Sequence, residues 1–521
     1  MSQPAEKSRM EYSMRNSAVG MVSKVAAILA GYIARVVFVR VMTTELVGLS
    51  GLLTNIINAL SLTSLGVEAA LVFSLYAPVA RGDEEKQASL MALFRRVYYV
   101  FAAVVLLFGL ILYTLLPMIL GEKTQIASLS IICALYVLNS VLSYFCSYRR
   151  MAFLSHQCNY VNELFDATSL IVLSTVQCIV LLLTRNFFLY LLIPVVCTVT
   201  ENLSLSALAG RWYPFLRRFN PPPVEKGERR EIMANIRAML MHKFGLVIIS
   251  NTDNVLLTWL FGLLAVGSYA NYYLITGSVA QVLDRFISGI TGSVGDLGVK
   301  VDRKHVGEVF RLAFFATAWI YGLAAVSLFI LLDNFIAFSF GETYVLGGML
   351  TLVLCMNLYL DGVRKATLIF RDSLGLFRYD RFKTPIEAAV NLGASILLAR
   401  HLGPVGVFLG TTVSVLLISF WVEPIVLYRG YLKEPVRSYF ASYFLYLPAV
   451  AFAGAATWYT CSFINGVGVV QLLAKLIVCL VLPNAVMALF FHRTAEYRAL
   501  RERVLSAGKR LQAKRRMRRR K

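Results

Sequence analysis

Five positively charged residues lie inside long apolar segments of this sequence: Lys24, Arg35, Lys243, Arg285 and Lys475. A cation at the centre of a bilayer costs about 2.5–3.5 kcal/mol on insertion scales, so such residues are kept where they face a wet cavity or a partner. A Lys side chain binds a phosphate as a mobile point charge, and an Arg side chain can grip one with two hydrogen bonds. This set of residues therefore predicts an anion held inside a membrane.

The membrane assignment depends on composition. The chain is 58% hydrophobic and only 15% charged, with a mean hydropathy of +0.67. Soluble domains have about 25% charged residues, so a soluble protein is excluded. Apolar runs of about 20 residues predict an all-α polytopic fold with fourteen spans. The spans lie near 17–39, 46–78, 97–119, 125–145, 163–184, 187–209, 238–262, 265–296, 312–332, 345–368, 384–399, 406–428, 440–461 and 468–491.

The charges outside the spans are distributed unequally. If the N-terminus is cytoplasmic, 42 of the 51 Lys and Arg residues fall on the cytoplasmic side and four on the opposite side. This asymmetry predicts that both termini are cytoplasmic. The net charge of +22 could also suggest nucleic acid, but the basic run 514–521 has no aromatic residue on which bases could stack. We expect the tail to contact anionic membrane lipids, and no nucleic acid.

The predicted organisation has two related halves. Shifting the sequence by 219 residues aligns Asn16 with Asn235, Lys24 with Lys243, Gly48 with Gly267, Arg81 with Lys300 and Asp83 with Asp302. Internal repeats are typical of secondary transporters, which move one bundle against the other. The predicted parts are a tail (1–16), a six-helix bundle (17–209), a cytoplasmic linker (210–237), a second six-helix bundle (238–428), two further helices (429–491) and a basic tail (492–521).

Catalytic and metal-binding patterns are missing from the sequence. The five His residues are scattered, the eight Cys residues lack metal-ligand spacing, and no Gly-rich phosphate loop is present. The connections between spans are short, so no sizeable loop could hold an active site. We therefore predict no enzyme, no metal site and no cofactor.

Several segments of the first two spans carry a family resemblance. They are the opening Asn16–Lys24, the run Glu45-Leu-Val-Gly48-Leu-Ser-Gly51-Leu-Leu-Thr-Asn55, the run Leu65-Gly66-Val-Glu68, and Tyr76-Ala-Pro78. These segments, with the helix count, repeat and short loops, resemble the Wzx-type O-antigen and capsule flippases of the multidrug, oligosaccharidyl-lipid and polysaccharide (MOP) exporter superfamily. The resemblance implies two six-helix bundles in a V around a cavity lined mainly by helices 1, 2, 7 and 8, with two extra C-terminal helices.

The same four helices carry the unusual charges. Lys24, Arg35, Lys243 and Arg285 are the candidate substrate-binding cations. Three acids accompany them: Glu68, Asp253 and Asp284. The sequence leaves open whether these acids are ion-pair partners or bind a coupling H+ or Na+. Polar residues that could bind sugar hydroxyls on these helices are Asn55, Asn58, Asn251, Asn254, Asn271 and Gln281.

Structural roles compete with the binding roles. Lys24 and Arg35 are eleven residues apart and share a helix face, yet either could extend toward an interface. Arg285 could be neutralised by one of the three acids, and Lys475 is expected to be a pairing or interfacial residue. These four helices nevertheless carry four cations and three acids, and this excess of positive charge points to an anionic substrate.

The resulting hypothesis is a flippase of the bacterial inner membrane. It would move an undecaprenyl-diphosphate-linked oligosaccharide from the cytoplasmic to the outer leaflet by alternating access, beside the polysaccharide polymerase machinery. Two alternatives remain. One is a cation-coupled multidrug or metabolite antiporter of the same fold, for which an acidic cavity would be expected. The other is a polytopic polysaccharide polymerase or glycosyltransferase, which the short loops disfavour.

Overall fold

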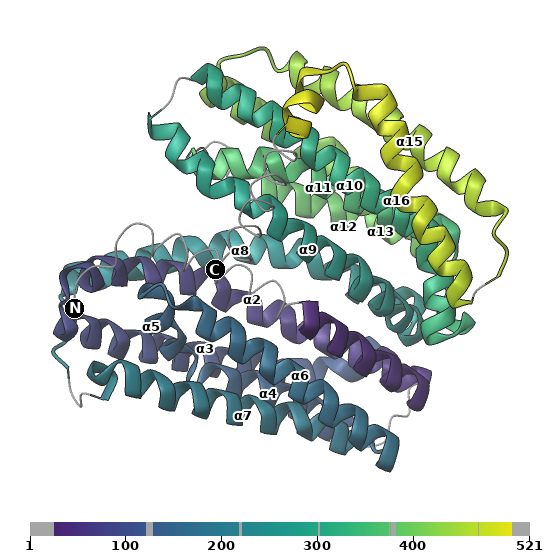
Figure 1. The fold of residues 1–521 in the computed structure, drawn as a ribbon. Coiled ribbons are helices and arrows are strands. Elements are labelled where there is room, and N and C mark those ends of the chain that lie inside the picture. The colour runs from purple at the N-terminus through teal and green to yellow at the C-terminus, as the bar shows by residue number, and fades with distance from the viewer. Residues whose placement is uncertain are drawn as a thin grey trace, which may run out of the picture. The chain divides into compact units, whose positions relative to one another are not determined.

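The computed structural model describes residues 25–120, 129–217, 221–300, 303–374, 376, 382–466 and 468–502. Within these ranges the regular secondary structure is helical throughout, as Figure 1 shows. The chain divides into two compact units, Met1–Gly267 and Ser268–Lys521. The predicted all-α fold is therefore confirmed.

The first unit is a bundle of long helices in which α3 packs against α4, α6 against α7, and α2 against α8 (Figure 1). A helix over 25–41 precedes them. The other elements are α2 (Thr44–Arg81), α3 (Glu84–Leu120), α4 (Leu129–Tyr144), η1 (Ser147–Arg149), α5 (Arg150–Ser155), α6 (Asn159–Thr184), α7 (Phe187–Trp212), η2 (Pro214–Arg217) and α8 (Lys226–Phe261).

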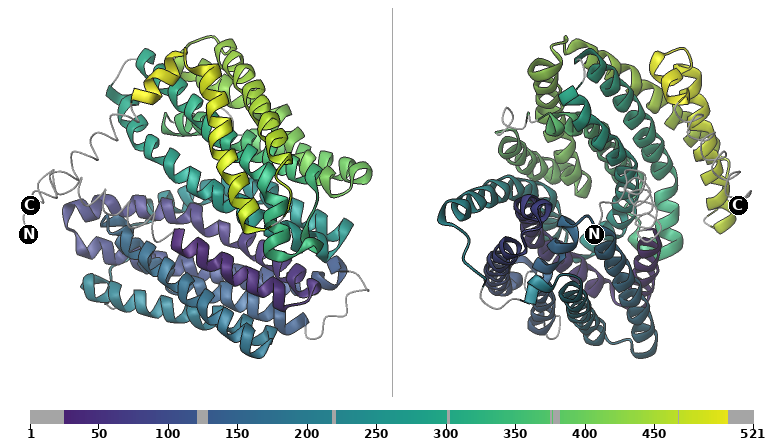
Figure 2. Two further views of the ribbon diagram at one scale, coloured as in Figure 1. Left: turned by 45° about the vertical axis from the view of Figure 1, so that its right-hand side comes forward. Right: turned by 60° about the vertical axis from the view of Figure 1, so that its left-hand side comes forward.

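Helix α9 (Leu263–Lys300) begins in the first unit and continues into the second. In the second unit α15 and α16, yellow-green and yellow in Figure 2, both pack on α10. The elements after α9 are α10 (Arg303–Phe340), η3 (Glu342–Tyr344), α11 (Gly348–Ser373), α12 (Lys383–Leu402), α13 (Pro404–Ser414), η5 (Val415–Ser419), α14 (Phe420–Leu427), η6 (Tyr428–Leu432), α15 (Arg437–Ser462) and α16 (Val469–Phe491).

Each predicted span coincides with a helix wherever the structure describes it. By length and composition alone, eight of the described helices are long and apolar enough to cross a membrane. Many helices extend beyond the predicted limits, such as α3, which starts at Glu84 instead of 97. Helix α8 starts at Lys226, inside the predicted linker, and α11 continues to Ser373, past the predicted end at 368. The predicted bundle boundaries stay predictions.

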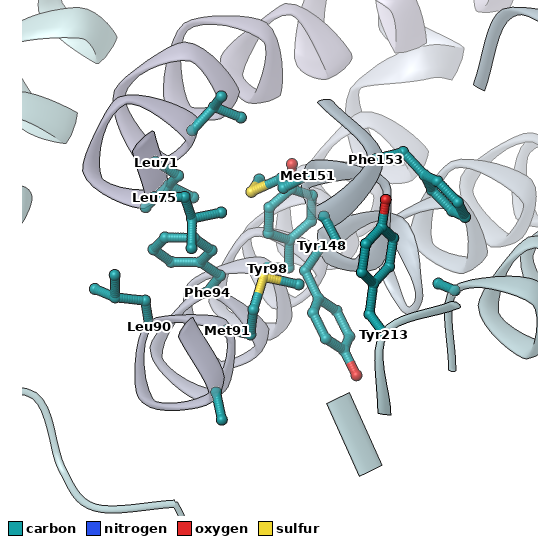
Figure 3. Close-up of a cluster of buried hydrophobic side chains, with 14 of the residues drawn as sticks. Leu71, Leu75, Leu90, Met91, Phe94, Tyr98, Tyr148, Met151, Phe153 and Tyr213 are labelled. Carbon is teal, nitrogen blue, oxygen red and sulfur yellow. The ribbon is translucent and has the colours of Figure 1, made fainter. Parts of the chain in front are cut away.

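A cluster of buried apolar side chains joins α2, α3, α5 and the end of α7 (Figure 3). Leu71 and Leu75 of α2 lie beside Phe94 of α3, and the ring centroids of Phe153 and Tyr213 are 5.4 Å apart. In a membrane protein such side chains hold helices together through close van der Waals packing. The cluster therefore fixes the short helix α5, which begins with Arg150.

The turn between α6 and α7 is held by its own polar groups. The side-chain oxygen of Asn186 accepts hydrogen bonds from the backbone N–H groups of Phe188 (2.9 Å) and Leu189 (3.2 Å). This is an N-cap, which satisfies donors that the first helical turn leaves unpaired. Arg185 ends α6 in the left-handed conformation, with φ of 50°. The two helices consequently run back along each other.

The backbone of α2 touches the start of α9 at Gly48. A Cβ added to Gly48 would lie 2.2 Å from the carbonyl oxygen of Leu263, and one added to Gly267 would lie 3.1 Å from the Gly48 Cα. Gly48 and Gly267 are also the pair that the shift by 219 residues aligns. Only glycine allows this approach without a backbone shift.

Replacing Gly48 with Ala is expected to destabilise the protein by about 1–3 kcal/mol, since backbone atoms must move to admit the methyl group. Thermal unfolding of the purified protein in detergent measures this change. Gly393→Ala in α12 is the matched control, because a Cβ there meets no atom within 4 Å. An unfolding temperature for Gly48→Ala equal to that of the control would contradict the close contact.

Candidate functional site

The predicted cation set is only partly within the described residues. Lys24 lies outside them, and the side chains of Lys243, Arg285, Asn58 and Asn251 do as well. The four-cation cavity therefore stays a prediction. The remaining predicted residues can be placed in their own units.

Arg35 faces the interior of the first unit. Its guanidinium lies 5.5 Å from the ring centroid of Phe38, and it is within electrostatic range of the hydroxyl groups of Tyr136 and Tyr190. Tyr136 shares a hydrogen bond of 2.7 Å with Ser50 of α2. Arg35 is thus surrounded by aromatic rings and hydroxyl groups, which suit hydrogen-bonding to an anion or a sugar.

The predicted polar residues differ in their exposure. Asn271, Asn254 and Asp253 are buried, with 0%, 6% and 9% of their surface exposed. Asn55 is partly exposed and Gln281 is exposed. Of these side chains, the exposed Gln281 is the most accessible to a ligand within its unit.

The predicted acid Asp284 is an ion-pair partner in the second unit. It accepts a hydrogen bond of 2.6 Å from the Tyr321 hydroxyl and forms an ion pair with Lys365 of α11. Lys365 is not among the predicted site residues, because its charge is counted on the cytoplasmic side although it lies within the predicted span 345–368. Lys365 lies about two turns before α11 ends at Ser373.

A second charged group, the Arg150 cluster, lies in the first unit and comprises Glu68, Arg150, Asp166 and Glu201. Arg150 at the start of α5 forms ion pairs with Asp166 of α6 and Glu201 of α7. Glu68 of α2 is within electrostatic range of Arg150 and Asp166. Three carboxylates therefore surround one guanidinium. The neighbouring Arg149 donates instead to the Ser206 carbonyl, at 3.1 Å.

The most enclosed charges, the Glu423 cluster, lie between α11, α12 and α14. Arg364 donates to both oxygens of Glu423, at 3.1 and 2.7 Å, and Lys383 donates to the same carboxylate at 2.5 Å. Only 1% of the Glu423 side chain is exposed. Arg364 also pairs with Asp361 at 3.1 Å and lies 3.7 Å from Glu387. These contacts make the Glu423 cluster a structural connection between three helices.

The arrangement of these groups suits binding better than bond-breaking chemistry. Among the described residues, no three His, Cys, Asp or Glu side chains are grouped to hold a metal ion. Lys475 of α16 is buried and within electrostatic range of Cys461 and Cys479. It lies on a different helix from the predicted cavity cations.

Comparison with known proteins identifies the family. Residues 13–293 match the family model described as polysaccharide biosynthesis protein. The chain belongs to this family. No curated protein shows significant sequence similarity to it.

Solved structures share the fold of this family member. The lipid II flippase MurJ, in an inward closed conformation, is similar with a TM-score of 0.67 and 11% identity, over 92% of this chain and 99% of that one. An aspartate-to-asparagine mutant of the Vibrio cholerae MATE transporter VcmN is similar with a TM-score of 0.58 and 14% identity, over 81% of this chain and 97% of that one. An inward-facing MATE family transporter of the MOP superfamily is similar with a TM-score of 0.57 and 12% identity, over 82% of this chain and 98% of that one.

These matches confirm the resemblance to the MOP superfamily and its polytopic helical fold. They support a multi-pass membrane protein with the architecture of transporters and flippases. At identities of 11–14% the structural similarity concerns the fold.

Proposed function

We propose that this protein flips a lipid-diphosphate-linked oligosaccharide, carried on undecaprenol, across the bacterial inner membrane by alternating access. The observation that carries the proposal is the match of residues 13–293 to the polysaccharide biosynthesis family, on a fold similar to that of a lipid II flippase. The family points to a sugar substrate and the fold to a transporter. We infer that the protein is not an enzyme.

The predicted cations supply the chemistry for the diphosphate. Lys24, Arg35, Lys243 and Arg285 would bind phosphate oxygens, and hydroxyl-bearing neighbours such as those around Arg35 would bind sugar. Because Asp284 is already paired with Lys365 and Tyr321, an ion-pair role is favoured for it over a coupling role. Glu68 remains the proposed site of a coupling ion, since its cluster holds more carboxylates than cations.

Binding of the purified protein to three ligands tests the proposed substrate class. An undecaprenyl-diphosphate oligosaccharide is expected to bind at least tenfold more tightly than its monophosphate analogue, since one charged hydrogen bond contributes about 1.5–3 kcal/mol. A cationic dye is expected not to compete. Tryptophan fluorescence titration in detergent measures these affinities. Tight binding of the dye, displaced by neither lipid, would instead favour the antiporter.

A further inference from the structure

A groove of about 580 Å³ runs along the first unit between α6 and α7. Its lining begins at Thr184 and Leu189, beside the turn, and reaches Phe165 and Ser204 at the other end. Residues 165 and 184 are nineteen positions apart, which is about 28 Å along a helix. The groove is therefore about as long as the hydrocarbon core of a bilayer is thick, roughly 30 Å.

The wall of the groove is apolar along most of its length. It is formed by aliphatic side chains from both helices, and several of them are exposed on the surface of the protein, including Val172 (49%), Val176 (37%) and Val196 (56%). Neither water nor a polar ligand is favoured against such a surface at membrane depth. A hydrocarbon chain is the complementary occupant.

One end of the groove is polar and negatively charged. Glu201 contributes to the lining there, with hydroxyl groups from Ser169 and Thr200. Ser169 hydrogen-bonds to Glu201, whose side chain is 17% exposed. Arg150 is shared between Glu201 and Asp166, so these three groups carry a net charge of −1. The end of the groove therefore attracts a cation and disfavours a phosphate that carries no compensating positive charge.

These features together suit a lipid with an apolar tail and an ammonium group in its head. We propose that the groove between α6 and α7 is a binding site for one aminophospholipid of the phosphatidylethanolamine class. An acyl chain lies along the apolar wall that includes Val172, Val176 and Val196, and the ammonium group donates hydrogen bonds to Glu201. The site is distinct from the proposed substrate cavity, because an anionic diphosphate is the wrong charge for Glu201.

Native mass spectrometry of the full-length protein tests the proposal with lipids that share their acyl chains. Phosphatidylethanolamine is expected to bind about tenfold more tightly than phosphatidylcholine or phosphatidylglycerol, as expected for one charged hydrogen bond. The quaternary ammonium of phosphatidylcholine has no N–H to donate, and phosphatidylglycerol has no cation. Equal binding of the three lipids by the unchanged protein would overturn the proposal.

Two variants with the same change in charge locate the head group. Glu201→Gln is expected to abolish the preference for phosphatidylethanolamine, whereas Asp166→Asn, which removes the same charge but leaves the carboxylate in the groove, is expected to weaken the preference only in part. Both changes remove one carboxylate from Arg150, but Asp166 does not contribute to the groove lining and its side chain is 56% exposed. Equal loss of the preference in both variants would contradict a direct contact with Glu201.

A third variant locates the chain. Val176→Trp places an indole in the middle of the groove without changing any charge, and it is expected to weaken phosphatidylethanolamine binding at least tenfold. This test remains informative if Glu201→Gln fails to fold. Unchanged lipid binding by a folded Val176→Trp protein would exclude the groove as the site.

Discussion

Transport by a Lys24→Gln, Arg285→Gln double variant is expected to fall at least 100-fold while the protein still inserts in the membrane. Each cation would donate a charged hydrogen bond to the diphosphate, and one such bond contributes about 1.5–3 kcal/mol. Two lost bonds therefore weaken binding by about 3–6 kcal/mol. Transport slows because this binding free energy offsets the cost of taking the phosphates out of water. The initial rate of transbilayer movement, divided by the amount of inserted protein, measures the effect.

Lys475→Gln provides the matched control for this double variant. Lys475 is also a cation within an apolar span, but it lies on α16 near two cysteine thiols. We expect this variant to transport at nearly the normal rate. A double variant that inserts normally and keeps its transport would show that Lys24 and Arg285 do not bind the substrate.

Replacing Glu423 with Gln is expected to destabilise the second unit by about 3–5 kcal/mol, which is the usual cost of leaving buried charges uncompensated. Glu423 is the shared partner of Arg364 and Lys383, whose side chains are only 13% and 7% exposed. With the carboxylate gone, Lys383 would lose its ion-pair partner in an enclosed site. Arg364 would keep only Asp361 and the more distant Glu387. The thermal unfolding temperature in detergent is expected to fall sharply.

Asp361→Asn tests whether the burial of Glu423 causes this loss. Asp361 also pairs with Arg364, at 3.1 Å, but its side chain is 57% exposed. Arg364 keeps both hydrogen bonds to Glu423 in this variant, so it is expected to unfold closer to the normal temperature than Glu423→Gln. Equal destabilisation by the two variants would contradict the account of the Glu423 cluster.

The helices of this protein could be predicted from the sequence because a run of about 20 apolar residues by itself indicates a membrane-spanning helix. The ends were harder to predict where charges continue a helix. Helix α11 passes Arg364 and Lys365 without ending, since both side chains find acidic partners on other helices. The predicted span 345–368 includes both residues but stops before Arg371, which pairs with Asp372 in the last turn of the helix.

The pairing of charges could not be predicted from spacing along the chain. Arg150 meets Glu201 51 positions later, and Arg364 meets Glu423 59 positions later. Such contacts depend on which helices become neighbours, and hydrophobic periodicity does not specify neighbours. One long-range contact does have a signal in the sequence. Gly48 and Gly267 are aligned by the internal shift, and the structure brings their backbones together.

The central claim is most directly tested by following a labelled undecaprenyl-diphosphate oligosaccharide across the membrane of proteoliposomes that contain the purified protein. A monophosphate lipid and a cationic dye serve as comparison substrates. We predict selective movement of the diphosphate lipid, with no lengthening of its sugar chain. Movement of the dye alone, or growth of the sugar chain without any movement of the lipid, would contradict the account.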